Sequence, residues 1–230
     1  MKTKLLMLVA TIFSVSYAVG QDDCEIYYPM QEGVKFQITH YGKTKKKTTS
    51  VVDYTISKVE KTGKGTVSTM TVAVDEGGKN EIPEQEIQMI CSGNKLSIDF
   101  ESLMNPDLLT QFGDIDYEIT GTNLEWPSDL SVGKTLPDAS MNMTISMAGM
   151  NMTISTVITD RKVTGKEKVT TPAGTFDCYV MTYNTTVNSM GMNTEMSSKQ
   201  WFAKGIGMVK QEDSRKGKIQ NMSELTAFSM

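Results

Sequence analysis

The chain has 230 residues, of which 39% are hydrophobic and 22% charged, and its formal net charge is −4 at pH 7. That length is enough for one domain with a sizeable hydrophobic core. An acidic chain lacks the basic face that phosphate binding requires, so we expect no nucleic acid partner.

The start of the chain has the pattern of a secretory signal peptide. Lys2 and Lys4 give a positive start, and residues 5–13 are apolar but too few to span a bilayer as a helix. Ala18-Val19-Gly20 fits a small-x-small cleavage site. We therefore predict a signal peptide over residues 1–20.

The remaining residues, 21–230, are predicted to form a single exported β-rich domain. They contain no second long apolar stretch, so we expect no transmembrane segment. The expected location is the periplasm or the outer cell envelope. Gln21, Asp22 and Asp23 precede Cys24, where a lipidated cysteine needs small and apolar residues, so no lipid anchor is expected there.

Three cysteines lie in the exported part, which favours one disulfide bond and one free thiol. Cys24 would tie down a chain end that otherwise frays, and Cys91 adjoins the turn residues 92–94 at a sheet edge. We predict a disulfide between Cys24 and Cys91 in preference to one between Cys24 and Cys178. Cys178 lies in mid-strand, where a buried free thiol acts as a small hydrophobic group.

Alternation of apolar and polar residues dominates the first half of the mature chain. Residues 34–40, 52–58 and 66–74 alternate with period two and are rich in Val, Ile, Thr and Tyr. Glycine-containing turns at 63–65, 77–80 and 92–94 separate these runs at hairpin spacing. The lysine-rich run 43–47 is predicted to be a solvated hairpin tip.

The middle of the chain breaks this rhythm. Residues 101–112 are the best helix candidate, and Pro106 could begin a second helical turn there. Residues 126–138 are expected to form an ordered loop, with Trp126 closing one end of the sheet. Strands then resume on both sides of the turn at residues 171–174, and the chain ends in a strand over 219–228.

Consecutive strands joined by short turns predict an antiparallel meander. About ten strands in one twisted sheet should curl or close. The predicted fold class is therefore mostly β, with a curved antiparallel sheet or incomplete β-barrel and one or two short helices.

Methionine is the most unusual feature, with 18 residues in the chain. The sequence MNMTIS occurs at 141–146 and again at 150–155, which predicts a hairpin folded at Ala148-Gly149. Methionine and isoleucine share one face of both strands, while Thr, Ser and Asn occupy the other. The candidate ligand-binding residues are Met141, Met143, Met147, Met150, Met152, Met190 and Met192.

Three interpretations of these methionines remain open. They could simply fill the inside of the sheet, or line an adaptable apolar surface for a lipid-like ligand or a partner segment. A third interpretation is Cu(I) handling, since thioether sulfur is a soft ligand. Ile145 and Ile154 interrupt the methionine face, which makes a copper site the least favoured of the three.

No catalytic residue, metal site or cofactor is predicted. His40 is the single histidine and lies in an alternating strand pattern, so neither a Ser/His/Asp nor a Cys/His set can be built without it. Asp114, Asp116 and Glu118 lack the glycine and final glutamate of a calcium loop. Gly205-Ile206-Gly207 precedes a strand, whereas a phosphate-binding loop precedes a helix.

Three stretches together resemble a known family. They are CEIYYP at 24–29 with Glu32-Gly33, TPAGTFDCY at 171–179, and WFAKGIGMVK at 201–210. These segments are similar to those of the TapB-like exported envelope proteins, a family of unknown function. The resemblance implies an exported domain similar to the half-open β-barrels of lipoprotein carriers, and it carries over no catalytic residue.

We therefore expect a non-enzymatic envelope protein that binds a lipid-like ligand or a partner segment on an apolar, methionine-lined concave face. The alternative is a structural or assembly protein that pairs with another envelope protein. Copper handling through the methionine hairpin is the minority alternative.

Overall fold

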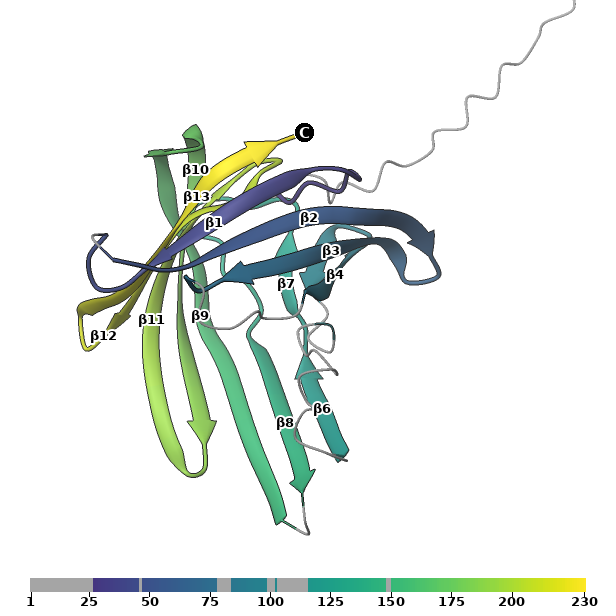
Figure 1. Cartoon of the computed structure of the whole chain (residues 1–230), viewed down its shortest axis with the longest axis vertical. Helices are drawn as coiled ribbons and strands as arrows, with labels where there is room; N and C mark the ends of the chain where they lie inside the picture. The colour runs from purple at the N-terminus through teal and green to yellow at the C-terminus, as the bar shows by residue number, and fades with distance from the viewer. Residues whose placement is uncertain (1–26, 46, 78–83, 99–101, 103–115, 148–149) are drawn as a thin grey trace, which may run out of the picture.

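The computed structural model describes residues 27–45, 47–77, 84–98, 102, 116–147 and 150–230, and these form one antiparallel sheet of thirteen strands (Figure 1). The predicted signal peptide and the helix candidate at 101–112, apart from Ser102, lie outside the described residues. The first seven strands are β1 Lys35–Tyr41, β2 Thr48–Thr62, β3 Gly65–Asp75, β4 Gln85–Ser92, β5 Lys95–Ile98, β6 Asp116–Thr122 and β7 Leu124–Pro127. The other six are β8 Ala139–Met147, β9 Met150–Thr171, β10 Gly174–Ser189, β11 Met192–Ala203, β12 Gly207–Arg215 and β13 Lys218–Ser229.

The strands curl into a nearly closed barrel with an unsealed seam. Their order is β6-β8-β9-β10-β11-β12-β13-β1-β2-β3-β4-β5-β7, so the two edge strands are β6 and β7. These two edges are consecutive in the chain and are separated by Asn123 alone. The chain thus runs directly from one edge of the sheet to the other, with β6 pairing with β8 and β7 pairing with β5.

The segment between β7 and β8 closes the upper part of this seam. The amides of Gly133 and Leu136 donate to carbonyls of β9, and Thr135 forms an isolated bridge with Lys162. Residues 128–138 therefore lie along the edge of β9 where β8 has not yet begun. This segment was predicted as an ordered loop, and its hydrogen bonds explain its order.

Alternation along the strands directs one set of side chains into the barrel. Phe36 and Ile38 of β1, Ile56 of β2 and Met70 of β3 pack together in one core cluster. A second cluster joins Trp126, Val163, Met181 and Phe202 near the upper seam. Trp126 on the edge strand β7 is 4% exposed and packs in this cluster. Burying aromatic and aliphatic side chains of this size stabilises by about 1.5–3 kcal/mol each.

The expected antiparallel meander is confirmed, although thirteen strands exceed the ten or so predicted. The extra strands are short ones around the middle of the chain, β5 and β7, with four residues each. Such strands contain only two periods of alternation, too few to stand out from the surrounding sequence.

The structure describes two of the three cysteines. Cys178 is a buried free thiol on the same face of β10 as Val180, as predicted, and burial raises its pKa to about 11. Cys91 at the end of β4 is also buried and is disulfide-bonded. Cys24 lies outside the described residues, so its pairing with Cys91 stays a prediction.

A thiol count tests that pairing. We expect the unfolded, non-reduced mature protein to react with one equivalent of iodoacetamide, at Cys178, and with three equivalents after reduction. Peptide mapping should recover Cys24 joined to Cys91. A Cys24–Cys91 bond would close a loop of about 67 residues, which in the chain-entropy model stabilises the folded state by about 4 kcal/mol. The Cys178→Ser variant is the matched control, and recovery of peptides joined at Cys178 would contradict the prediction.

Candidate functional site

The predicted methionine hairpin is formed by β8 and β9, and its register places the apolar residues on one face. Met143 lies opposite Ile154, and Ile145 lies opposite Met152. The next strand continues this face, because Ser189 of β10 pairs with Ile154. We call this surface the methionine face, and define it by Ile119, Met141, Met143, Ile145, Met152, Ile154, Ile158 and Val187.

The methionine face continues the inner face of the barrel. Along β10 the residues Met181, Tyr183, Thr185 and Val187 alternate to one side, and Met181 belongs to the core cluster at the upper seam. Val187 pairs with Thr156 of β9, which in turn pairs with Met141 of β8. The lower half of the sheet thus presents an inner surface that is a direct extension of the core.

The predicted methionines occupy three kinds of position. Met143 is buried, Met141 is half-buried, and Met152 is 37% exposed. Met147 and Met150 are register partners at the end of the hairpin, and their side chains lie outside the described set. Met190 and Met192 sit at the β10–β11 turn with 75% and 71% of their surfaces exposed. The structure therefore groups Met141, Met143 and Met152, and places Met190 and Met192 at the tip.

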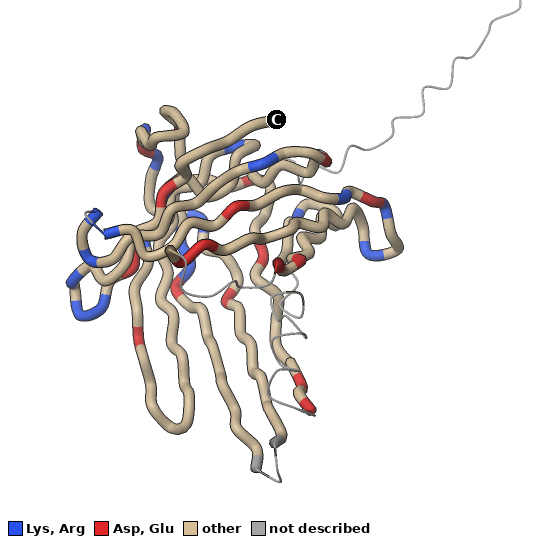
Figure 2. Tube along the Cα trace, viewed as in Figure 1, with Lys and Arg blue, Asp and Glu red and all other residues tan. Residues whose placement is uncertain are grey.

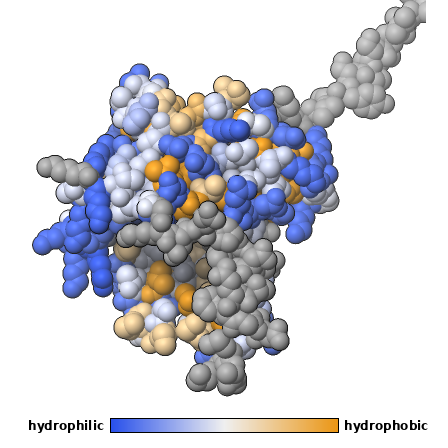
Figure 3. Space-filling model, in the orientation of Figure 1, coloured by the Kyte–Doolittle hydropathy of each residue, from blue (hydrophilic) through white to orange (hydrophobic). Residues whose placement is uncertain are grey.

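Charged side chains are missing from the parts of β8, β9 and β10 that carry this face. No Asp, Glu, Lys or Arg occurs in residues 139–159 or 179–194, although 22% of the whole chain is charged. Figure 2 shows the lower parts of β8, β9 and β10 without coloured segments. Figure 3 shows hydrophobic side chains gathered in the lower part of the molecule, whereas the upper part is mostly hydrophilic. The lower parts of β8, β9 and β10 are thus uncharged and partly apolar.

The opposite face of the same strands is polar and hydrogen-bonded. Thr144 pairs with Thr153 through their hydroxyls, Ser146 donates to Asn151, and Asn188 donates to Asn193. Such cross-strand pairs each contribute roughly 0.2–1 kcal/mol. These pairs hold the two strands of each hairpin together on the polar face.

Polar side chains cross the inner face where the methionine face meets the core. Ser198 donates to Asp213 at 2.7 Å, and Gln211 donates to the same carboxylate at 2.8 Å. Tyr183 hydrogen-bonds Ser198, and burial raises the pKa of Tyr183 to about 12, so the phenol stays neutral. His40 of β1 contacts Ser223 of β13 at 2.8 Å. Together these polar side chains form a belt on the inside of the sheet that runs from β10 to β1.

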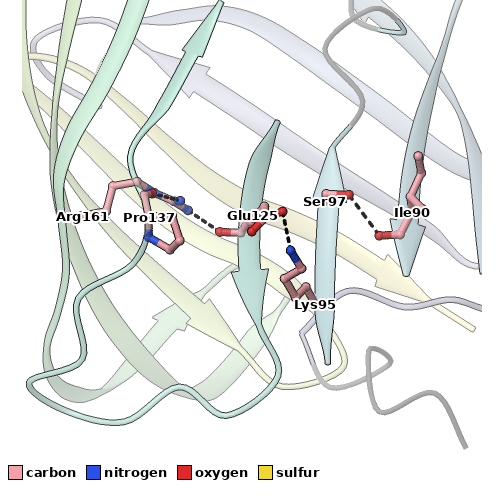
Figure 4. A network of polar contacts seen from close by, with 6 residues as sticks. All are labelled: Ile90, Lys95, Ser97, Glu125, Pro137 and Arg161. Atoms are coloured by element: carbon pink, nitrogen blue, oxygen red, sulfur yellow. Dashed lines mark hydrogen bonds and ion pairs between the residues drawn. The ribbon is translucent and has the colours of Figure 1, made fainter. Parts of the chain in front are cut away.

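Arg161 is buried at the same level, on the other side of Tyr183. Only 1% of its surface is exposed, and it donates to the carbonyl oxygens of Pro137 at 2.7 Å and Glu125 at 2.8 Å (Figure 4). Since Glu125 lies on β7 and Arg161 on β9, these bonds cross the seam. The Glu125 side chain points away to Lys95 at 2.8 Å. Burial lowers the pKa of Arg161 to about 10, so the guanidinium remains charged at neutral pH.

A β-bulge turns Arg161 inward. Thr182 of β10 pairs with Lys162, but Asn184 pairs with Thr159, so β9 has one extra residue there. Asp160 takes up the distortion with φ of 55°, a left-handed conformation that Asp tolerates, and its carboxylate accepts from Asn184 at 2.9 Å.

A hollow of about 620 Å³ opens beside the lower half of β11. The register between β11 and β12 ends at Ser197 and Ser214, so residues 192–196 have no neighbour from β12. Thr185 and Met196 line the hollow from the inner side, and Arg215 and Lys216 line it from the β12–β13 turn. Because Asn184, Thr186, Glu195 and Ser197 also line it, the hollow lies mainly on the polar outer face, beside the edge where β12 ends.

The described residues contain no group of three or more His, Cys, Asp or Glu side chains that could hold a metal ion. A copper site built from methionine alone gains little support, because Met141, Met143 and Met152 each have Thr or Ile opposite them and the register pairs only Met147 with another methionine, Met150. The raised pKa of Cys178 keeps that thiol protonated, which leaves it a poor nucleophile. The described part of the chain also contains no helix with the length and hydropathy needed to cross a bilayer.

Sequence reasoning missed Arg161 and the contributions of β6 and β10. Ile119 lies on the methionine face because it pairs with Met143, and Val187 because it pairs with Thr156, the partner of Met141. Neither residue lies in a methionine-rich segment. A sequence signal for the bulge does exist. Ile158 and Val163 are five residues apart, so strict alternation cannot direct both of them inward, and one extra residue between them is required.

Comparisons with known proteins agree with this architecture. The family model described as DUF3108-like matches residues 31–225. A crystal structure of a protein assigned as exported, with a YmcC-like fold, from Bacteroides fragilis NCTC 9343 superposes with a TM-score of 0.69. That structure shares 18% identity, over 90% of this chain and 100% of the other.

A protein assigned as a lipoprotein from Parabacteroides distasonis ATCC 8503 gives the same TM-score with 21% identity, over 90% of this chain and 99% of the other. At these identities the likeness concerns the fold alone. No curated protein matches the chain at a significant level. The finer resemblance to TapB-like proteins is not tested by these matches and stays a prediction.

The His40 environment generates a pH prediction. Burial lowers the pKa of His40, with Asp213 opposing the shift, so the unfolded chain takes up the proton first as the pH falls. The stability that depends on neutral His40 is fully present above the unfolded pKa of about 6.5 and is lost as the pH falls below it. Urea unfolding should therefore show lower stability at pH 5.5 than at pH 7.5, with a slope below about 1.4 kcal/mol per pH unit.

The chain has a single histidine, so the His40→Gln variant is a complete control. Its unfolding free energy should vary less between these two pH values than that of the wild type. An equal pH dependence in both proteins would show that His40 does not titrate with folding.

Proposed function

The chain belongs to the DUF3108-like family, and from that premise we propose that it is a non-enzymatic binding protein of the cell envelope whose ligand is lipid-like and lies on the methionine face. One observation supports this most directly. The inner surface of the barrel continues beyond the packed core as an uncharged, half-exposed apolar face. A protein that only needed a core would bury such a face.

The side chains of the methionine face suit a flexible hydrocarbon. Methionine has three rotatable bonds and a polarisable sulfur, so it adapts to ligands of irregular shape. Isoleucine and valine between the methionines keep the surface apolar. The absence of charge in 139–159 and 179–194 removes the desolvation cost that a bound alkyl chain would otherwise impose.

An enzymatic role has little support. Reaction at this surface would need a nucleophile or a titratable pair near it, and the groups on the inner face are hydrogen-bonded into the sheet. Asp213 accepts two bonds and His40 contacts Ser223. We also propose, from the predicted signal peptide, that the mature protein works outside the inner membrane.

A second candidate function rests on the free edge of β11. Residues 192–196 have no β12 neighbour in the described part of the chain, and a strand from another envelope protein could pair with them. The Glu195→Pro variant removes a backbone N–H from this edge, because the two-residue turn at Met190-Gly191 makes Thr194, and not Glu195, the residue that is hydrogen-bonded to β10. If the protein acts in assembly, a stoichiometric partner should co-purify with the wild type and be lost with this variant, while lipid binding should be unchanged.

A charge placed on the methionine face tests the proposed lipid binding. Met152 is 37% exposed, so its replacement leaves the core intact. We expect Met152→Glu to weaken binding of the apolar probe N-phenyl-1-naphthylamine at least tenfold, because a buried carboxylate is costly beside an apolar ligand. Fluorescence titration of the mature protein measures the affinity.

The matched control is Thr153→Glu, which adds the same charge at the next residue of β9, on the opposite face. That variant should bind the probe as the wild type does. Equal weakening by both variants would indicate a general electrostatic or folding effect, and unchanged binding in both would remove the methionine face as the site.

A further inference from the structure

Two buried N–H donors without acceptors lie side by side at the upper end of the methionine face. Nε of Arg161 and Nε1 of Trp126 have no hydrogen-bond partner, although the two side chains are only 1% and 4% exposed. They contact each other, with the guanidinium carbon 5.5 Å from the centre of the Trp126 ring. Buried donors are almost always paired, so two orphans in contact indicate a missing acceptor.

The charge of Arg161 is also uncompensated. Its terminal nitrogens donate to the neutral carbonyl oxygens of Pro137 and Glu125, and no ion pair in the described residues includes it. The nearest acids do not fill this role directly, because the Glu125 carboxylate pairs with Lys95 and Asp138 is exposed. A buried cation without a counter-ion is strongly unfavourable, and an anion beside it removes that cost.

Arg161, which lacks an acceptor for Nε and a counter-ion, lies at the end of the methionine face. On β9 the inner residue on the core side of Arg161 is Val163, and the inner residue toward the hairpin tip is Ile158. Across the bulge, Arg161 faces Tyr183 of β10. A ligand lying along the methionine face would therefore end at the guanidinium Nε–H and the indole N–H, both of which can donate, whereas the Tyr183 hydroxyl already donates to Ser198.

We propose that Arg161 and Trp126 bind the anionic oxygen head group of an amphiphile whose hydrocarbon chain lies on the methionine face. This inference rests on the proposed lipid binding and names the class of ligand. A carboxylate fits the donors well, since a planar guanidinium and a neighbouring N–H can serve its two oxygens. In this arrangement Arg161 keeps its bonds across the seam, and the head group takes the donor that remains.

The test compares oleate with oleyl alcohol, which has the same chain and an uncharged head. Displacement of N-phenyl-1-naphthylamine from the mature protein should show oleate binding at least tenfold more tightly than the alcohol. Arg161→Gln should abolish this preference while leaving the affinity for oleyl alcohol within about twofold. Lys162→Gln is the matched control, because it removes the same charge from the next residue, which is exposed. This control should keep the preference for oleate.

Equal affinity of the wild type for oleate and the alcohol would overturn the assignment of the head-group site while leaving the proposed function intact. A preference for oleate that survives in Arg161→Gln would also overturn it. Failure of the wild type to bind either compound or the probe would instead refute the proposed function, and the inference with it.

A second measurement covers the case in which Arg161→Gln does not fold. The chain has two tryptophans, so Trp201→Phe leaves Trp126 as the only indole reporter. Oleate should then change the emission of Trp126 at saturation, and oleyl alcohol should change it much less. Identical spectral responses to the two compounds would contradict a head group at Trp126.

Discussion

The closure of this barrel depends on one buried guanidinium. The sheet has two edges, and the chain joins them at Asn123 without pairing β6 to β7. Arg161 bonds the carbonyl of Glu125 on β7 and that of Pro137 before β8, so it ties β9 to the far edge of the sheet. Hydrogen bonds to a charged donor are stronger than neutral ones, and burial excludes the water that would compete for them.

Arg161 separates two parts of the inner face that differ in how tightly their side chains are packed. Above Arg161 the inner face is packed by aromatic and aliphatic side chains from strands on both sides of the seam. Below it the inner face of β8 and β9 remains half-exposed along much of its described length. The lower hairpins are therefore stabilised chiefly by ladder hydrogen bonds and polar pairs on their other face.

The alternation of apolar and polar residues predicts much of the fold, but it does not predict the inward position of Arg161 or its hydrogen bonds across the seam. The strand pattern around Phe36 and Ile38, the hairpin of β8 and β9 and the buried thiol of Cys178 all follow from local sequence. Simple alternation does not place Arg161 inside the barrel, because it is three residues from Ile158 and a regular strand would direct these two side chains to opposite faces. The inward direction arises from the bulge at Asp160 and from acceptors that are 24 and 36 residues away.

The same division explains why methionine, and not leucine, lines the lower half. A leucine face at half exposure would favour collapse or self-association, since it offers one rigid shape and strong hydrophobicity. Methionine at Met141, Met143 and Met152 keeps the face apolar while its flexible side chains fit variable neighbours. Uncharged hydrogen-bonding residues on the other face fix the strands without adding charges near an apolar ligand. The lower sheet is thus held in position from outside and left adaptable inside, which is the combination that a lipid-binding surface requires.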